Sequence, residues 1–223
     1  MVHKELLVIA EPALKKVLDH PFWAGLRDGS LPGEALRHFV QQNSEHLLPA
    51  CGRALARCGA AAPRDSHALM LGRAVVGSLE AGIRLRARYE ELADELELPA
   101  LGADQVAVDP FTHGYVGTLA AASTASYAAG IGALLPIAWF NHKVCEDLVE
   151  RHKLGARYDK WIEAYQPGPG YARTVQAFLD LVDEVGEDCS DSERARLVEQ
   201  FTIATRYEWM LAEASWQRPV WPV

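Results

Sequence analysis

The sequence has few of the features by which common enzyme and nucleic-acid-binding classes are identified. Its four cysteines form no CxxC pair, and no histidine spacing near them predicts a zinc site. No serine lies in a GxSxG turn, and no glycine-rich phosphate loop is present. The net charge of −8 lacks the basic excess that nucleic acids and anionic membranes require. We therefore expect neither a nucleic acid nor a membrane as a partner.

We also expect no export signal, because charges stand on both sides of the short apolar stretch near the N-terminus. Reduced thiols and a cytoplasmic location are the expectation. The longest apolar stretch, from Ala120 to Phe140, is about as long as a membrane span. Serine, threonine, glycine, tyrosine and proline interrupt it, so it predicts a buried helix.

Helix-forming residues dominate what is present, and apolar residues recur at spacings of three and four. We expect an all-α chain with one domain over residues 1–223. The expected helices are roughly 4–20, 30–58 with a bend at Pro49, 66–96, 115–153 with a break near 128–132, 157–165, 171–187 and 190–215. Ser190 and Glu193 have the spacing of a capping box at the start of the last helix.

Polar residues interrupt the apolar stripes of three of these helices, and such interruptions indicate functional positions. Asn43 falls on the stripe of the second helix, and His46 lies at its edge. Glu208 falls on the stripe of the last helix. Asn141 and His142 follow the apolar stretch that contains Pro136.

Each of these positions has a structural interpretation beside the functional one. A carboxylate that faces a core has a raised pKa, which suits Glu208 to general acid or base catalysis. Alternatively, Glu208 pairs with Arg206 or another arginine at the core margin. Asn43 is either a buried tether between helices or a ligand contact. His46 and His142 are more typical of hydrogen-bonded edge histidines than of catalysts.

Four blocks of the sequence carry a family resemblance: HPFWAGLRDGSLPGEALRHFVQQN, GALLPIAWF, YDKWIEAY and TRYEWMLAEASW. In order and spacing they resemble the TenA family, also called thiaminase II or aminopyrimidine aminohydrolase. The resemblance implies a haem-oxygenase-like helical bundle without haem, a small-molecule substrate, no cofactor, and a homo-oligomer, usually a tetramer. Family members hydrolyse thiamin or an aminomethyl-aminopyrimidine that is salvaged from degraded thiamin.

The resemblance also assigns residues. The glutamate that relays protons in the family matches Glu208, and two pocket tyrosines match Tyr115 and Tyr165. Such tyrosines can hold a flat heteroaromatic ring by stacking and by hydroxyl contacts.

Four other positions depart from the family pattern. The aspartate that binds the aminopyrimidine is replaced by Asn43, and a nearby aromatic residue by His46. The nucleophilic cysteine is replaced by Ile137, and the tyrosine four residues later by Asn141. Isoleucine cannot form the covalent adduct that a cysteine forms. Cys145 is two turns away, about 12 Å along a helix, which is too far to replace it.

No residues predict a metal site. A branch of this fold carries a di-iron centre, but the third helix has Glu80 with no histidine after it. His142 and Glu146 are four residues apart and form only a weak candidate pair.

Three functions stay open. The first is that the chain is a TenA-like enzyme with an altered pocket, which acts on a C–N bond of a small heteroaromatic or amide-containing metabolite, such as one of specialised metabolism. In this enzyme Glu208 is the general acid or base, and Asn43, His46 and Asn141 bind the substrate. The chain is alternatively the thiamin-salvage enzyme working without its cysteine, or a non-catalytic binder of a pyrimidine-like ligand.

Overall fold

The computed structural model describes residues 1–102 and 106–223 of the chain. Its helices are α1 (Val2–Leu18), α2 (Pro21–Asp28), α3 (Gly33–Gln42), the π-helix η1 (Asn43–Leu47), α4 (Leu48–Ala61), α5 (Asp65–Leu92), α6 (Pro110–Ala125), α7 (Tyr127–Arg151), α8 (Asp159–Tyr165), α9 (Tyr171–Asp188) and α10 (Asp191–Gln217). The described residues include no strand. The all-α prediction is therefore confirmed.

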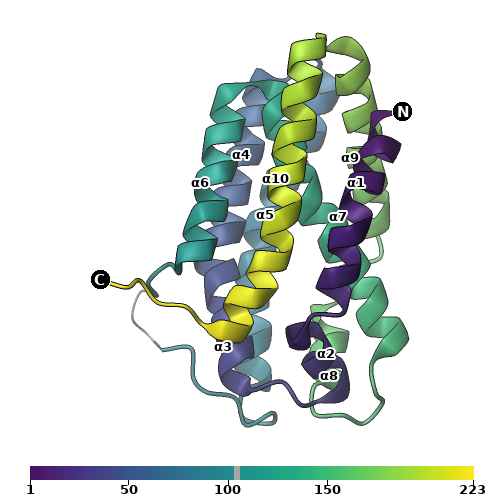
Figure 1. Ribbon diagram of the computed structural model, residues 1–223. Helices are drawn as coiled ribbons and strands as arrows, with labels where there is room; N and C mark the ends of the chain where they lie inside the picture. Colours follow the sequence, from purple (N-terminus) through teal and green to yellow (C-terminus); the bar gives the residue numbers. More distant parts are fainter. Residues whose placement is uncertain (103–105) are drawn as a thin grey trace.

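The long helices run side by side as a bundle, and the short α2 and α8 lie together at one end of it (Figure 1). Helix α7 is buried along most of its length and packs most extensively against α10. Their backbones come very close at Gly132, where an added Cβ atom would lie 2.2 Å from the Leu197 carbonyl oxygen. Only glycine permits this approach. It brings the faces of α7 and α10 that carry the predicted polar residues into one core.

Two prolines change the expected boundaries at the N-terminal end. The first helix ends at Leu18 because His20 precedes Pro21 and is extended, as the residue before a proline prefers. The distortion expected at Pro49 lies just before it, as the π turn Asn43–Leu47. Proline has no N–H to give to the preceding turn, so a wider turn there is physically reasonable.

The expected helix from Tyr115 to Lys153 is two helices, and its break is not where we predicted it. Asp109 caps an earlier start, because its carboxylate accepts the backbone N–H groups of Phe111 and Thr112, both at 2.8 Å. Ser126 is fully extended and separates α6 from α7. Helix α7 then continues through Pro136. Residues 103–105 of the predicted connector lie outside the described part of the chain.

One hydrophobic cluster runs through the bundle and includes side chains from α1 to α10. A buried ion pair adds to it: the Arg27 guanidinium of α2 donates to the Asp147 carboxylate of α7 at 2.5 Å. The apolar stretch from Ala120 to Phe140 is divided between α6 and α7. None of the helices in the described residues is both long enough and apolar enough to cross a membrane.

Candidate active site

Glu208 lies at the centre of the candidate site, on the part of α10 that faces the bundle. Its Oε1 atom accepts a 2.6 Å hydrogen bond from the Tyr115 hydroxyl of α6. Burial raises the pKa of the Glu208 carboxyl to about 7, although the Tyr115 hydrogen bond opposes that rise. A carboxyl with this pKa is present in both protonation states near neutral pH, which suits it to give and to take a proton.

The pairing of Glu208 with an arginine, which was the structural alternative, is not observed. Arg206 points to the exposed side of α10, and no lysine or arginine in the described residues makes an ion pair with Glu208. The residue keeps partial solvent exposure. No cation in the described residues therefore holds its carboxyl in the ionised state.

Tyr115 is positioned from both sides. Its ring stacks on the Tyr207 ring with the centroids 4.9 Å apart and the planes at 8°. Its hydroxyl is committed to Glu208. Burial and then the Glu208 charge raise the pKa of Tyr115 well above its ordinary value, so it stays a hydrogen-bond donor.

Asn141 and Tyr165 form a second polar pair. The Asn141 Nδ2 atom of α7 donates to the Tyr165 hydroxyl of α8 at 2.9 Å. Burial, the nearby thiol of Cys145 and the charges of Tyr171 and Glu208 raise the pKa of Tyr165 well above its ordinary value. Tyr165 packs against the same hydrophobic cluster that contains Tyr115.

Asn43 faces the same core from the π turn. It is 7% exposed, and its Nδ2 atom donates to the Phe39 carbonyl oxygen at 2.8 Å. It therefore does not tether two helices, since this bond closes within its own segment. The Phe39 ring in turn meets the Tyr165 ring, with the centroids 6.1 Å apart.

His46 does not join this group, although we expected it to bind the ligand with Asn43. Its Nε2 atom is 2.9 Å from the Val106 carbonyl oxygen, in the segment that precedes α6. Its side chain also lines a surface hollow between α4 and α6. Residues three apart in a π turn do not share a face as they do in an α-helix, and this places Asn43 and His46 on different sides.

Ile137 follows Pro136 on α7 and is partly buried against the core. No cysteine offers a thiolate in its place. Burial raises the pKa of the Cys145 thiol to about 12 and that of the Cys51 thiol to about 11. Thiols with such values are protonated at neutral pH and are poor nucleophiles.

The structure adds aromatic residues that the sequence analysis missed. Tyr171 donates its hydroxyl to the carbonyl oxygen of Ala138, next to Ile137, at 3.2 Å. Trp23 and Trp161 both lie against the Tyr165 ring, with centroid distances of 6.3 and 6.2 Å. An aromatic residue near a helix end was the signal available for Tyr171, but it does not specify a partner.

The other candidate polar groups have ion-pair partners of their own. His142 pairs with Glu146 at 3.3 Å on α7, and Glu80 pairs with Arg84 on the exposed side of α5. Across residues 1–102 and 106–223, no group of three or more histidine, cysteine, aspartate or glutamate side chains is placed to hold a metal ion.

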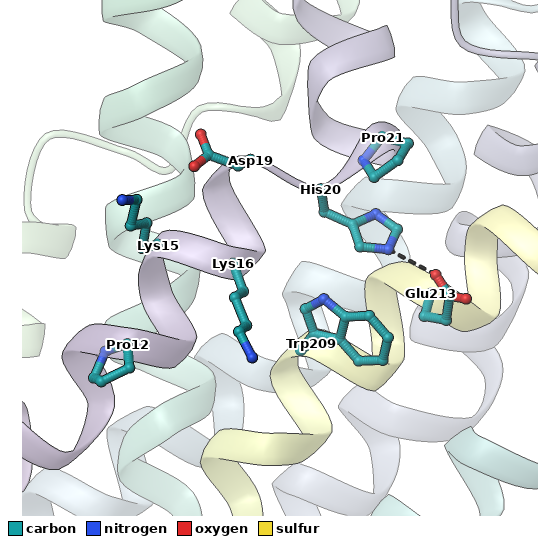
Figure 2. Close-up of a pocket in the computed structure, with 8 residues that line it drawn as sticks. All are labelled: Pro12, Lys15, Lys16, Asp19, His20, Pro21, Trp209 and Glu213. Carbon is teal, nitrogen blue, oxygen red and sulfur yellow. Dashed lines mark hydrogen bonds and ion pairs between the residues drawn. The ribbon is translucent and has the colours of Figure 1, made fainter.

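A hollow of about 620 Å³ lies on another face of α10 and is lined by Trp209 and Glu213 but not by Glu208. Figure 2 shows the His20 ring pointing from the α1–α2 junction to Glu213, beside the Trp209 indole. His20 is buried and accepts the Phe22 N–H at Nδ1, so its Nε2 atom donates to Glu213 at 2.9 Å. With both ring nitrogens occupied, His20 joins three helices and is a structural residue here.

Comparisons with known proteins identify the family of the chain. Residues 9–217 match the model of the TENA/THI-4/PQQC family. The chain is 27% identical over 205 residues to the aminopyrimidine aminohydrolase of Bacillus subtilis (strain 168), which covers 91% of this chain and 84% of that protein.

Solved structures are similar to the whole bundle. A TenA homologue from P. horikoshii OT3 has a TM-score of 0.80 at 23% identity and covers 98% of this chain and 100% of its own. A domain with a haem-oxygenase-like fold from Shewanella denitrificans OS217 has a TM-score of 0.70 at 11% identity. The match covers 96% of this chain and 92% of that domain. The predicted haem-oxygenase-like fold is thereby confirmed.

Proposed function

The chain belongs to the TENA/THI-4/PQQC family, and from this premise we propose that it hydrolyses a C–N bond of a small heteroaromatic or amide-containing metabolite. The observation that carries the proposal is the contact between Glu208 and Tyr115 at 2.6 Å, with a Glu208 pKa of about 7. The similarity to an aminopyrimidine aminohydrolase supports the same reaction class.

In the proposed reaction Glu208 serves twice. As a carboxylate it takes a proton from the attacking water while the oxygen–carbon bond forms. As a carboxylic acid it then gives that proton to the nitrogen as the C–N bond breaks, so the amine leaves neutral. A pKa near the working pH makes both transfers feasible, and such catalysis contributes roughly 10²–10⁴-fold.

The ligand-binding residues that we propose are Asn43, Tyr115, Ile137, Asn141 and Tyr165. An asparagine is neutral and both donates and accepts hydrogen bonds, which suits Asn43 and Asn141 to an amide or a ring nitrogen. Ile137 offers an apolar contact where a cysteine would attack a ring. For this reason we favour a substrate that is hydrolysed without a covalent adduct. His46 has no part in this proposal, since it faces the surface hollow.

An ammonia-release assay tests the proposal. The protein is offered a panel of aminopyrimidines and small amides, together with thiamin and its aminomethyl-aminopyrimidine. We expect turnover of a panel member, with kcat lowered at least about 100-fold by Glu208→Gln. Glu199→Gln is the matched control, because Glu199 is exposed on the same helix. A Glu208→Gln variant that is as active as the control would overturn the proposal.

Two other results of that assay have definite meanings. Turnover of thiamin or its aminopyrimidine, increased by Ile137→Cys, would assign the salvage reaction instead. Thermal stabilisation by a pyrimidine without turnover of any compound would indicate a binding protein.

The proposal includes a homo-oligomer, either a dimer or a tetramer. Four exposed apolar side chains, Leu69, Val76, Leu79 and Ile83, follow one side of α5 at heptad-like spacing. Such a stripe is typical of a helix that packs against a second copy. Light scattering after size-exclusion chromatography should show an oligomer that Ile83→Glu dissociates. Leu154→Glu, in an exposed loop, is the control and should leave the mass unchanged. The cytoplasmic location stays a prediction.

A further inference from the structure

A second hollow, of about 330 Å³, opens between α4 and α6, beside the π turn. These two helices are neighbours on one side of the bundle (Figure 1). His113, Val116 and Ala120 of α6 line the hollow, whereas Tyr115, which contacts Glu208, faces the core. The hollow is therefore separate from the candidate active site, and an inference about it does not rest on the proposed function.

Basic side chains dominate the hollow. Arg53 and Arg57 lie one helical turn apart on α4, and both line it. Neither guanidinium makes an ion pair with a carboxylate in the described residues, and the contact of Arg57 is a long one, 3.5 Å to the Ser123 hydroxyl. The chain has a net charge of −8, so two neighbouring arginines without acidic partners form a local positive patch on an acidic protein.

The acidic residue that lines the hollow does not offset them. Both carboxylate oxygens of Glu45 are engaged elsewhere: Oε1 accepts from Arg86 at 2.9 Å, and Oε2 accepts the Val106 N–H at 3.2 Å. Glu45 is thus turned toward Arg86, which also donates to Glu90 at 3.1 Å, and in the described residues Glu45 makes no ion pair with Arg53 or Arg57.

Two histidine rings on the wall are held in place. The Nε2 atom of His46 donates to the Val106 carbonyl oxygen, since a carbonyl can only accept. His113 packs edge-on against the Trp221 indole at a centroid distance of 5.5 Å. Trp221 is itself tied down, because its Nε1 atom donates to the Val108 carbonyl oxygen at 2.9 Å. Both rings on this wall therefore have contacts within the chain.

We propose that this hollow binds a small molecule that carries a phosphate monoester. The guanidinium groups of Arg53 and Arg57 pair with the phosphate oxygens, for which their planar donor geometry is suited. The apolar side chains of Ala50, Val116 and Ala120 contact the organic part of the ligand. His113 lies at the same wall as a further donor.

Isothermal titration calorimetry with phenyl phosphate tests this inference, with inorganic phosphate and chloride at equal ionic strength for comparison. We expect phenyl phosphate to bind more tightly than inorganic phosphate, and chloride not to compete. The double variant Arg53→Gln/Arg57→Gln should weaken binding at least about tenfold. Arg73→Gln is the matched control, because Arg73 is an exposed arginine of α5 outside the hollow.

Several results would overturn the inference. One is that phenyl phosphate binds the double variant as tightly as it binds the Arg73→Gln control. Another is that titration with phenyl phosphate produces no more heat than titration with chloride. If the double variant does not fold, Arg53→Gln alone decides, since that exposed side chain makes no hydrogen bond within the described residues. Tighter binding of inorganic phosphate than of phenyl phosphate would refute the monoester as ligand.

Discussion

Replacing Glu208 by glutamine should make the protein more stable at alkaline pH and change little at acidic pH. The reason is the raised pKa of the Glu208 carboxyl, which goes from 4.5 to about 7 because of burial. An acid with a higher pKa in the folded state binds more protons when folded. Stability is therefore lost as the pH rises from about 4.5 to about 7, and the loss is complete above pH 7.

The size of the effect follows from the two pKa values. Each pKa unit corresponds to about 1.4 kcal/mol, so the ionised carboxyl costs the folded state about 3 kcal/mol at pH 8. At pH 5 the cost is about 1 kcal/mol, because the folded carboxyl is still protonated while the unfolded carboxyl, with its pKa of 4.5, is only partly ionised. These are upper values, since Glu208 keeps partial solvent exposure. Glutamine keeps an oxygen that accepts the Tyr115 hydrogen bond, so the substitution removes mainly the charge.

The measurement is urea unfolding of the wild type and of Glu208→Gln at pH 5 and pH 8, at one protein concentration. The variant should gain about 2 kcal/mol over the wild type between these pH values. Histidines also titrate in this interval, but they are the same in both proteins and cancel in the comparison. Equal pH dependence of the two proteins would show that Glu208 has an ordinary pKa, and the catalytic argument would lose its basis.

Three further predictions concern the partner of Glu208 and two structural contacts between helices. Tyr115→Phe removes the hydrogen bond that lowers the pKa of Glu208. The pKa of Glu208 should therefore be higher in this variant, and its stability should keep falling to a higher pH than that of the wild type. His20→Ala removes the cap of α2 and the bond to Glu213, and should cost about 2 kcal/mol in urea unfolding, while Glu213→Gln costs less. Asp147→Asn leaves the buried Arg27 without its carboxylate and should cost about 3–5 kcal/mol, which a loss of under 1 kcal/mol would contradict.

Helix content was predictable because apolar residues at helical spacing are a local signal. Errors arose where a single side chain overrides the local pattern. Asp109 starts α6 earlier than expected by accepting two backbone N–H groups, and the extended Ser126 ends it. Spacing shows which face of a helix is buried, but it does not show which hydrogen bonds a capping residue completes.

The candidate site was predictable in part. Glu208 could be identified because a carboxylate interrupts an apolar stripe, and the family resemblance points to the same residue. We expected His46 beside Asn43 because residues three apart in an α-helix lie on nearly the same face. The π turn rotates that segment, so His46 faces the hollow between α4 and α6. A change of helix type by one residue per turn is not visible in the spacing of apolar residues.

By itself, the sequence determined the helical class, the family and the identity of the glutamate that we propose for catalysis. The tertiary structure alone decided what that residue touches. Tyr115 and Glu208 are 93 positions apart, and they meet because α6, α7 and α10 cross closely, with Gly132 allowing the contact at Leu197. Local periodicity specifies a buried face, whereas partners across helices depend on how the helices cross and on which side chains permit a close approach.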